Sequence, residues 1–130
     1  MTKFDPAAYI SSLNIDVMRF GLEAISGLLL RLGNPQNSYK TILIAGTNGK
    51  GSTAAMTASI LHSAGYKTGL YTSPHLIDVR ERISVNKREI SANDFSKIIA
   101  TVKKEINQQA TYFEVLTAAA LLYFQRREID

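Results

Sequence analysis

The chain has 130 residues, 45% of them hydrophobic, no cysteine and a formal net charge of +4. Its length fits one domain or part of one, its hydrophobic content is enough for a core, and the missing cysteines exclude disulfides and cysteine-zinc sites. Without a basic stretch interleaved with aromatics, a transmembrane-length apolar run or a signal peptide, we expect a cytoplasmic protein that binds small anionic substrates, not nucleic acid or a membrane.

Two helices are predicted in the first third of the chain. Asp5-Pro6 is typical of a helix cap followed by proline in the first turn, and it predicts a short helix through about Ser12. Leucines and an isoleucine recur at helical spacing over residues 21–32, and Gly33 followed by Asn34-Pro35 ends that second helix.

A strand, a helix and another strand are predicted next. Residues 41–45 have the composition of a buried strand, residues 51–64 that of a helix ended by Gly65, and residues 67–71 that of a second strand. Strands joined by one helix in so short a span pair in parallel with a right-handed crossover. The sequence therefore predicts an α/β fold with a parallel sheet flanked by helices.

The remainder predicts a loop, a hairpin and two amphipathic helices. The loop covers residues 72–76, and the hairpin joins residues 82–85 to 88–90 through Asn86-Lys87. Ser91 caps a helix whose apolar face runs from Phe95 to Ile106. A last helix over residues 112–127 turns five side chains inward: Phe113, Leu116, Ala120, Leu121 and Phe124.

Ile129-Asp130 reads as the entry to a further strand. Two parallel strands and one hairpin make a small sheet for this many amphipathic helices, several of which would keep an exposed apolar stripe. We therefore expect residues 1–130 to be the N-terminal part of a larger nucleotide-binding domain, truncated on its C-terminal side.

The glycine-rich segment at residues 42–53 carries the clearest chemistry. A β-branched run leads into a turn with several glycines, one lysine and hydroxyls, and a helix of small residues follows. Such a turn lets backbone amides surround phosphate oxygens, the lysine reaches the terminal phosphates, and a hydroxyl holds Mg²⁺. We expect an ATP site made of Gly46, Thr47, Asn48, Gly49, Lys50, Gly51, Ser52 and Thr53.

The segment departs from the general G-x-x-x-x-G-K-[ST] pattern. That pattern requires glycine at position 44 and a hydroxyl at position 51, where this chain has Ile44 and Gly51. A kinase-like or GTPase-like P-loop module needs the hydroxyl directly after the lysine, so the departure disfavours that alternative. A purely structural turn is a second alternative, but turn geometry has no use for Lys50.

Four blocks together resemble the folylpolyglutamate synthase and dihydrofolate synthase family of the Mur ligase superfamily. They are the glycine-rich run, Phe20-Gly-Leu-Glu23 before it, Leu70-Tyr-Thr-Ser-Pro-His-Leu76 with Glu81-Arg82-Ile83, and Thr111-Tyr-Phe-Glu114 with Thr117-Ala118. The resemblance covers nearly the whole chain but only about the first third of a full-length member. It implies a P-loop-containing, Mur-ligase-like domain.

The resemblance also implies roles for particular residues. The family's ATP site falls on residues 47–50 with Ser52 beside them, and its magnesium-holding serine matches Ser73. Its pteridine-binding positions match Arg19, Phe20, Gly21, Leu22, Thr111, Tyr112, Phe113 and Glu114. The family's other magnesium ligands, a modified lysine and a C-terminal domain fall beyond Asp130, so we expect the isolated chain to be inactive. The alternative to the ligase interpretation is a non-catalytic fragment that folds partially and binds nucleotide weakly or not at all.

The implied activity is ATP-dependent ligation of L-glutamate to a folate, to dihydropteroate, or to both. ATP converts the acceptor carboxylate to an acyl phosphate, glutamate attacks it, and ADP and phosphate leave; Lys50 is the expected catalytic residue and Mg²⁺ the metal. The full-length parent is expected to be a monomer.

Several of these residues have simpler interpretations. Ser73 before Pro74 is a common turn pair, His75 is a loop residue near the site without a chemical role, and Glu114 favours a helix start through the dipole. Phe113 is expected in the core as well as against the pterin. We place a Glu114 hydrogen bond to the pterin ahead of the helix-start interpretation, because a carboxylate beside an apolar stripe needs a donor.

Overall fold

The computed structural model describes residues 4–13, 21–107 and 110–130. Helices and short strands are joined by loops and brief 3₁₀ turns. In chain order the elements are α1 (Pro6–Ser12), α2 (Glu23–Arg31), η1 (Pro35–Asn37), α3 (Lys50–Ser63), β1 (Gly69–Tyr71), η2 (Val79–Arg82), β2 (Ile83–Val85), β3 (Arg88–Glu89), α4 (Ala92–Glu105) and α5 (Tyr112–Arg126).

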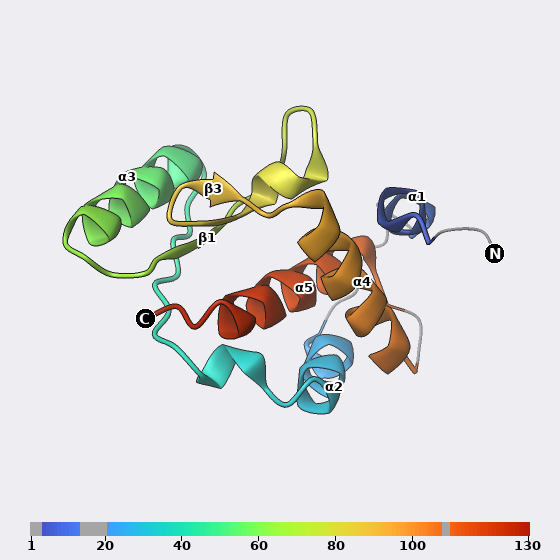
Figure 1. The fold of residues 1–130 in the computed structure, drawn as a ribbon. Helices are drawn as coiled ribbons and strands as arrows, with labels where there is room; N and C mark the ends of the chain where they lie inside the picture. Colours follow the sequence, from blue (N-terminus) through green and yellow to red (C-terminus); the bar gives the residue numbers. More distant parts are fainter. Residues whose placement is uncertain (1–3, 14–20, 108–109) are drawn as a thin grey trace.

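Helix α5 is the centre of the molecule (Figure 1). It contacts α1, α2, α4 and η1, while α3 packs against β1 and stands apart from the other helices. Leu116 of α5 and Ile99 of α4 are fully buried, and Ile83 of β2 joins the same core. The predicted apolar face of α4 is confirmed by its buried residues, Phe95, Ile98, Ile99 and Val102.

The helix starts follow the capping signals in the sequence. The Asp5 carboxylate accepts hydrogen bonds from the amides of Ala7 and Ala8 at 2.9 and 3.1 Å, and Pro6 occupies the first turn of α1. Ser91 Oγ accepts from the Asp94 amide at 3.0 Å and begins α4. Both predicted helix starts are confirmed.

Three short strands form one antiparallel sheet in the order β1-β2-β3. Asn86 and Lys87 both have positive φ values, 51° and 66°, as the two-residue hairpin turn between β2 and β3 requires. The predicted hairpin is therefore confirmed. Gly69 of β1 lies so close to α5 that an added Cβ would come within 2.8 Å of the Phe124 ring.

The α/β class is confirmed, but the described residues form antiparallel pairs only, and the predicted parallel pairing does not form among them. Residues 41–45 form no strand, and the expectation of burial also fails, because Ile42 is 62% and Leu43 89% exposed. Asp130 lies between this segment and the stretch that leads into β1. It accepts from the Lys40 amide at 3.2 Å and donates to the Lys67 carbonyl at 3.0 Å, so the two segments do not bond to each other there.

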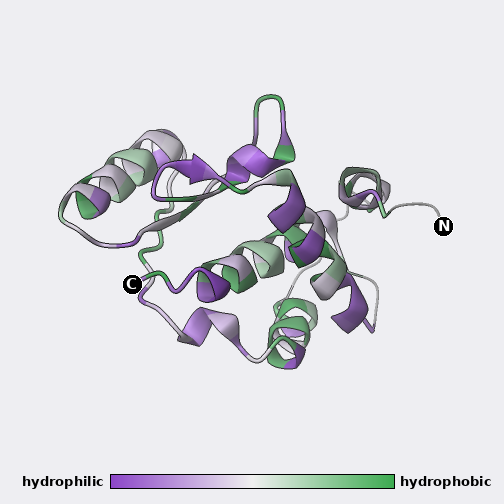
Figure 2. Cartoon of the chain, viewed as in Figure 1, coloured by the Kyte–Doolittle hydropathy of each residue, from purple (hydrophilic) through white to green (hydrophobic). Residues whose placement is uncertain are grey.

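The unpaired segment 41–45 and α3 contain hydrophobic residues (Figure 2), and several of their apolar side chains are exposed. Helix α3 buries none of its residues; Met56 is 59% and Ile60 68% exposed. Exposed large hydrophobics cost stability unless something covers them. Among the described residues, no helix has both the length and the apolarity to cross a membrane.

Candidate functional site

The predicted phosphate loop is a glycine turn at the start of α3. Gly46 and Gly49 have φ values of 150° and 75°, and Gly49, in the left-handed conformation that glycine adopts without strain, is the N-cap. No side chain caps this helix, and the first helical bond runs from the Thr53 amide to the Gly49 carbonyl at 3.0 Å. The amides of residues 50–52 are therefore left for a ligand, at the positive end of a 14-residue helix.

Lys50 folds back over this loop. Its Nζ donates to the Gly46 carbonyl at 2.5 Å and to the Thr47 carbonyl at 3.2 Å. The ammonium group thus lies beside the glycine turn, where a phosphate chain held by the helix amides would meet it. The structure brings all eight predicted ATP-binding residues into this one exposed turn.

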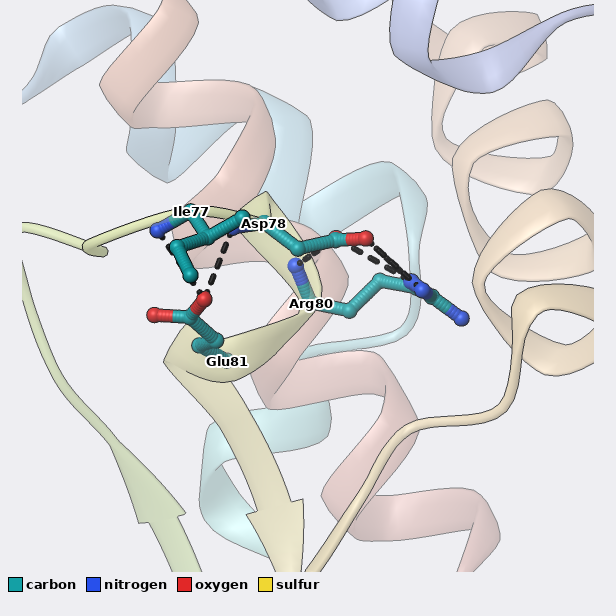
Figure 3. Close-up of polar contacts among 4 residues, drawn as sticks. All are labelled: Ile77, Asp78, Arg80 and Glu81. Atoms are coloured by element: carbon teal, nitrogen blue, oxygen red, sulfur yellow. Dashed lines mark hydrogen bonds and ion pairs between the residues drawn. The ribbon is translucent and has the colours of Figure 1, made fainter.

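The second predicted segment is the loop between β1 and β2, which carries Ser73 and projects from the body of the molecule (Figure 1). One carboxylate holds its tip. Glu81 accepts from the amides of Ile77 and Asp78 at 3.0 and 2.7 Å (Figure 3), and from the Leu76 amide at 2.8 Å. This loop is therefore ordered by its own hydrogen bonds even though Leu76 and Ile77 are over 90% exposed, at 93% and 92%.

Asp78 begins the short helix η2 and completes this arrangement. Its carboxylate accepts from the Arg80 amide at 2.9 Å and pairs with the Arg80 guanidinium at 2.7 Å (Figure 3). Asp78 and Glu81 form a reciprocal capping box. Sequence reasoning missed this pair, although Asp78-Val-Arg-Glu81 has the spacing of the motif.

Both carboxylates make the loop sensitive to acid. Hydrogen bonds from Arg80 lower the pKa of Asp78 from 3.8 to about 2, and amides, that of Leu76 first, lower the pKa of Glu81. Because both pKa values are lower in the folded loop, their stabilisation is complete above the ordinary carboxylate pKa and is lost as the pH falls toward 2. We expect the NMR amide signals of residues 76–78 to move as the pH falls through this range.

The start of α5 supplies the third segment. Thr111 and Glu114 form a capping box: the Thr111 amide donates to Glu114 Oε2 at 2.8 Å, and the Glu114 amide donates to Thr111 Oγ1 at 3.2 Å. The structure thus shows Glu114 in the helix-start role. Its bond to a pterin stays a prediction.

Phe113 is 55% exposed, so the prediction that it belongs to the core is wrong. Tyr112 and Leu116 face the core instead: both are buried and belong to the hydrophobic cluster that includes residues of α4. The exposed Phe113 ring lies 6.4 Å from the Tyr71 ring, centroid to centroid. A flat aromatic surface at this point remains compatible with a pterin contact.

The structure joins the Ser73 loop to the start of α5. The Tyr71 hydroxyl lies 3.2 Å from Thr117 Oγ1, and the Arg82 guanidinium carbon lies 5.5 Å from the Tyr112 ring centroid. No hydrogen bond among the described residues links the phosphate loop to either segment. Leu22 is 72% exposed beside Gly21, while Arg19 and Phe20 fall outside the described residues.

Ser73 offers Mg²⁺ a single hydroxyl. The described ranges contain no cluster of three or more histidine, aspartate or glutamate side chains that could hold a metal ion. Mg²⁺ commonly binds through one or two protein groups, phosphate oxygens and water. These residues therefore fit one ligand of a nucleotide-bound Mg²⁺ and do not form a metal site by themselves.

The chain has relatives of known name, although no family model matches it. It is 43% identical over 139 residues to a probable bifunctional folylpolyglutamate synthase/dihydropteroate synthase of Halobacterium salinarum, covering 98% of the chain and 17% of that relative. It is 41% identical to the dihydrofolate synthase/folylpolyglutamate synthase of Bacillus subtilis, covering 80% of the chain and 26% of the relative.

Solved structures agree with these relatives. The folylpolyglutamate synthase of Thermotoga maritima superposes with a TM-score of 0.89 at 45% identity, over 95% of this chain and 30% of the other. E. coli FolC in complex with DHPP and ADP superposes with a TM-score of 0.89 at 35% identity, over 96% of this chain and 31% of the other.

The fold is thus that of a Mur-ligase-like nucleotide-binding domain. The chain belongs to the folylpolyglutamate synthase/dihydrofolate synthase family. It spans 17 to 26% of the two curated relatives named above.

Proposed function

We propose that this chain is the nucleotide-binding part of a ligase that uses ATP to join L-glutamate to a folate or to dihydropteroate. The observation that carries the proposal is Lys50 lying over the glycine turn at the uncapped start of α3. The names of the relatives, and the structures of E. coli FolC with DHPP and ADP and of an FPGS-AMPPCP-folate complex, support it.

The chemistry asks the protein mainly for positioning and charge neutralisation. A carboxylate is a poor electrophile, so transfer of the terminal phosphoryl group of ATP to its oxygen creates an acyl phosphate and releases ADP. The glutamate amine then attacks the acyl carbon and expels phosphate. The ammonium group of Lys50 and the amides of residues 50–52 would neutralise charge on the transferring group, and Mg²⁺, for which Ser73 would be one ligand, would supply further neutralisation.

The acceptor side of the site is assigned to the start of α5. The exposed face of Phe113, beside the Tyr71 ring, offers a surface on which a pterin ring can stack. Its chain neighbours Thr111, Tyr112 and Glu114 are further proposed contacts, as are Arg19, Phe20, Gly21 and Leu22.

We also propose that residues 1–130 form the N-terminal part of a larger ATP-binding domain. The Thr72 amide bonds to Arg82 and the Asn86 amide to the Thr68 carbonyl, so the polar backbone groups of Gly69 and Tyr71 point to the edge of β1 that faces away from β2. The exposed apolar segment 41–45 lies nearby. Asp130 bonds to Lys40, just before that segment, and to Lys67, just before β1. A strand that continues from Asp130 would pair with the free edge of β1 and with the segment 41–45. Because the isolated chain lacks that strand, we expect it to bind Mg·ATP weakly and to catalyse no ligation.

The test is product formation by the full-length protein. Mass spectrometry of reactions with ATP, Mg²⁺ and glutamate should show an acceptor that has gained glutamate, with dihydropteroate, tetrahydrofolate or both. A protein that modifies neither acceptor would overturn the proposal. Calorimetric titration of the 130-residue chain with Mg·ATP tests the proposal that these residues are only part of the ATP-binding domain. Tight binding would contradict it.

A further inference from the structure

Arg82 is a buried cation that the proposed chemistry does not use. It is only 8% exposed, and it lies where η2 ends and β2 begins. Buried charges are normally paired with an opposite charge. Among the described residues, the ion pair in this region joins Arg80 to Asp78, and no carboxylate pairs with Arg82.

Ring side chains lie beside Arg82 instead, and Tyr71 is one of its neighbours. Its Nε donates to His75 Nδ1 at 2.8 Å, and its guanidinium carbon lies 5.5 Å from the centroid of the Tyr112 ring. His75 belongs to the loop that carries Ser73, and Tyr112 belongs to the first turn of α5. The Arg82 guanidinium thus contacts both the loop that carries the proposed metal ligand Ser73 and the start of α5, where the acceptor is proposed to bind.

The direction of the hydrogen bond fixes which ring nitrogen of His75 is the acceptor. The Nε of arginine always carries a proton, so Nδ1 of His75 has to offer a lone pair. The ring proton of a neutral histidine then lies on Nε2, for which no partner occurs among the described residues. Nε2–H is therefore presented as a donor, and the ring is held in one orientation.

We propose that Arg82 is a positioning residue that holds the His75 loop against the start of α5 and keeps His75 in its Nε2–H form. The planar guanidinium makes both contacts at once, the in-plane bond to His75 and the face-on contact with Tyr112. A lysine at this position would keep the charge but not this combination. The binding readout below rests on the proposed folate acceptor, whereas the spectroscopic readout does not.

The direct test is the ¹⁵N NMR spectrum of His75 in the full-length protein, assigned with a His75→Ala variant. In its neutral form, His75 should show Nδ1 unprotonated and Nε2 protonated. In the Arg82→Lys variant, the ¹⁵N chemical shifts of His75 should move to the average of the Nδ1–H and Nε2–H tautomers, as in a free imidazole. A protonated Nδ1 in the unmodified protein would overturn the proposal.

The second test is the dissociation constant for the acceptor, dihydropteroate or tetrahydrofolate, measured by fluorescence titration without ATP. We expect Arg82→Lys to weaken binding about tenfold, the scale of one hydrogen bond to a charged group. His75→Ala should have a similar effect, and the double variant should be less than additive, because the two residues act through one bond. Arg80→Lys is the matched control and should stay within about twofold.

The outcomes separate this inference from the ligase proposal. Loss of acceptor affinity in Arg82→Lys supports the inference even if no glutamate is ever transferred. Unchanged affinity together with an unchanged His75 spectrum would overturn it, whatever the ligase activity proves to be. Additive effects of the two substitutions would also overturn it, because they would show that Arg82 does not act through His75.

Discussion

Replacing Lys50 by alanine is expected to lower the kcat of the full-length protein by about a hundredfold or more. The ammonium group lies at the Gly46 and Thr47 carbonyls, beside the free amides of the first turn of α3. Charge that builds up on the transferring phosphoryl group would lose its main cationic neighbour in this turn. Steady-state rates of ADP formation measure the loss.

The matched control is Lys40→Ala, which removes an exposed lysine a few residues before the glycine turn. Its rate should stay close to that of the unmodified protein. Because Lys50 is also exposed, Lys50→Ala should leave the free energy of unfolding nearly unchanged. Equal ligation rates for the Lys50 variant and the unmodified protein would contradict the assignment.

Leu116→Ala is expected to have the largest effect on stability. Leu116 is fully buried at the centre of α5, and truncating such a leucine costs about 2–5 kcal/mol. Leu43→Ala removes the same atoms from a side chain that is 89% exposed, so in the 130-residue chain it should cost less than about 0.5 kcal/mol. Urea unfolding of the two variants measures the difference, and equal destabilisation would contradict the observed core.

The same Leu43 substitution tests the proposed completion of the sheet. In the full-length protein, a strand continuing from Asp130 would cover residues 41–45. Leu43→Ala should then cost about 2 kcal/mol or more, as a buried leucine does. A cost that stays near zero in the full-length protein would show that this segment is not covered.

The sequence was sufficient for the helices and the hairpin because their signals are local. Asp5, Ser91 and the apolar face from Phe95 to Val102 act within one or two turns of their own helix, and Asn86-Lys87 sets its own turn. Strand pairing depends on partners distant in the sequence. The apolar run at 41–45 would be buried only if a strand paired with it, and no strand pairs with it among the described residues.

The candidate site shows the same division. The glycine turn and Lys50 belong to one continuous segment, so the sequence alone places them together, and their binding of phosphate stays a prediction. Phe113 was misplaced because helical spacing alone does not decide which residues at the end of a helix face the core. The contact of Arg82 with His75 and Tyr112 could not be predicted, because loop, strand and helix meet there only in the folded chain.

The most direct measurement of the central claim is ADP release by the full-length protein with Mg·ATP, a folate or dihydropteroate acceptor, and L-glutamate. We predict that ADP forms in step with the glutamylated product and that sustained turnover stops when either the acceptor or glutamate is left out. Sustained ADP release that is indifferent to both would contradict the claim, because it would show that the nucleotide site does not serve the ligation.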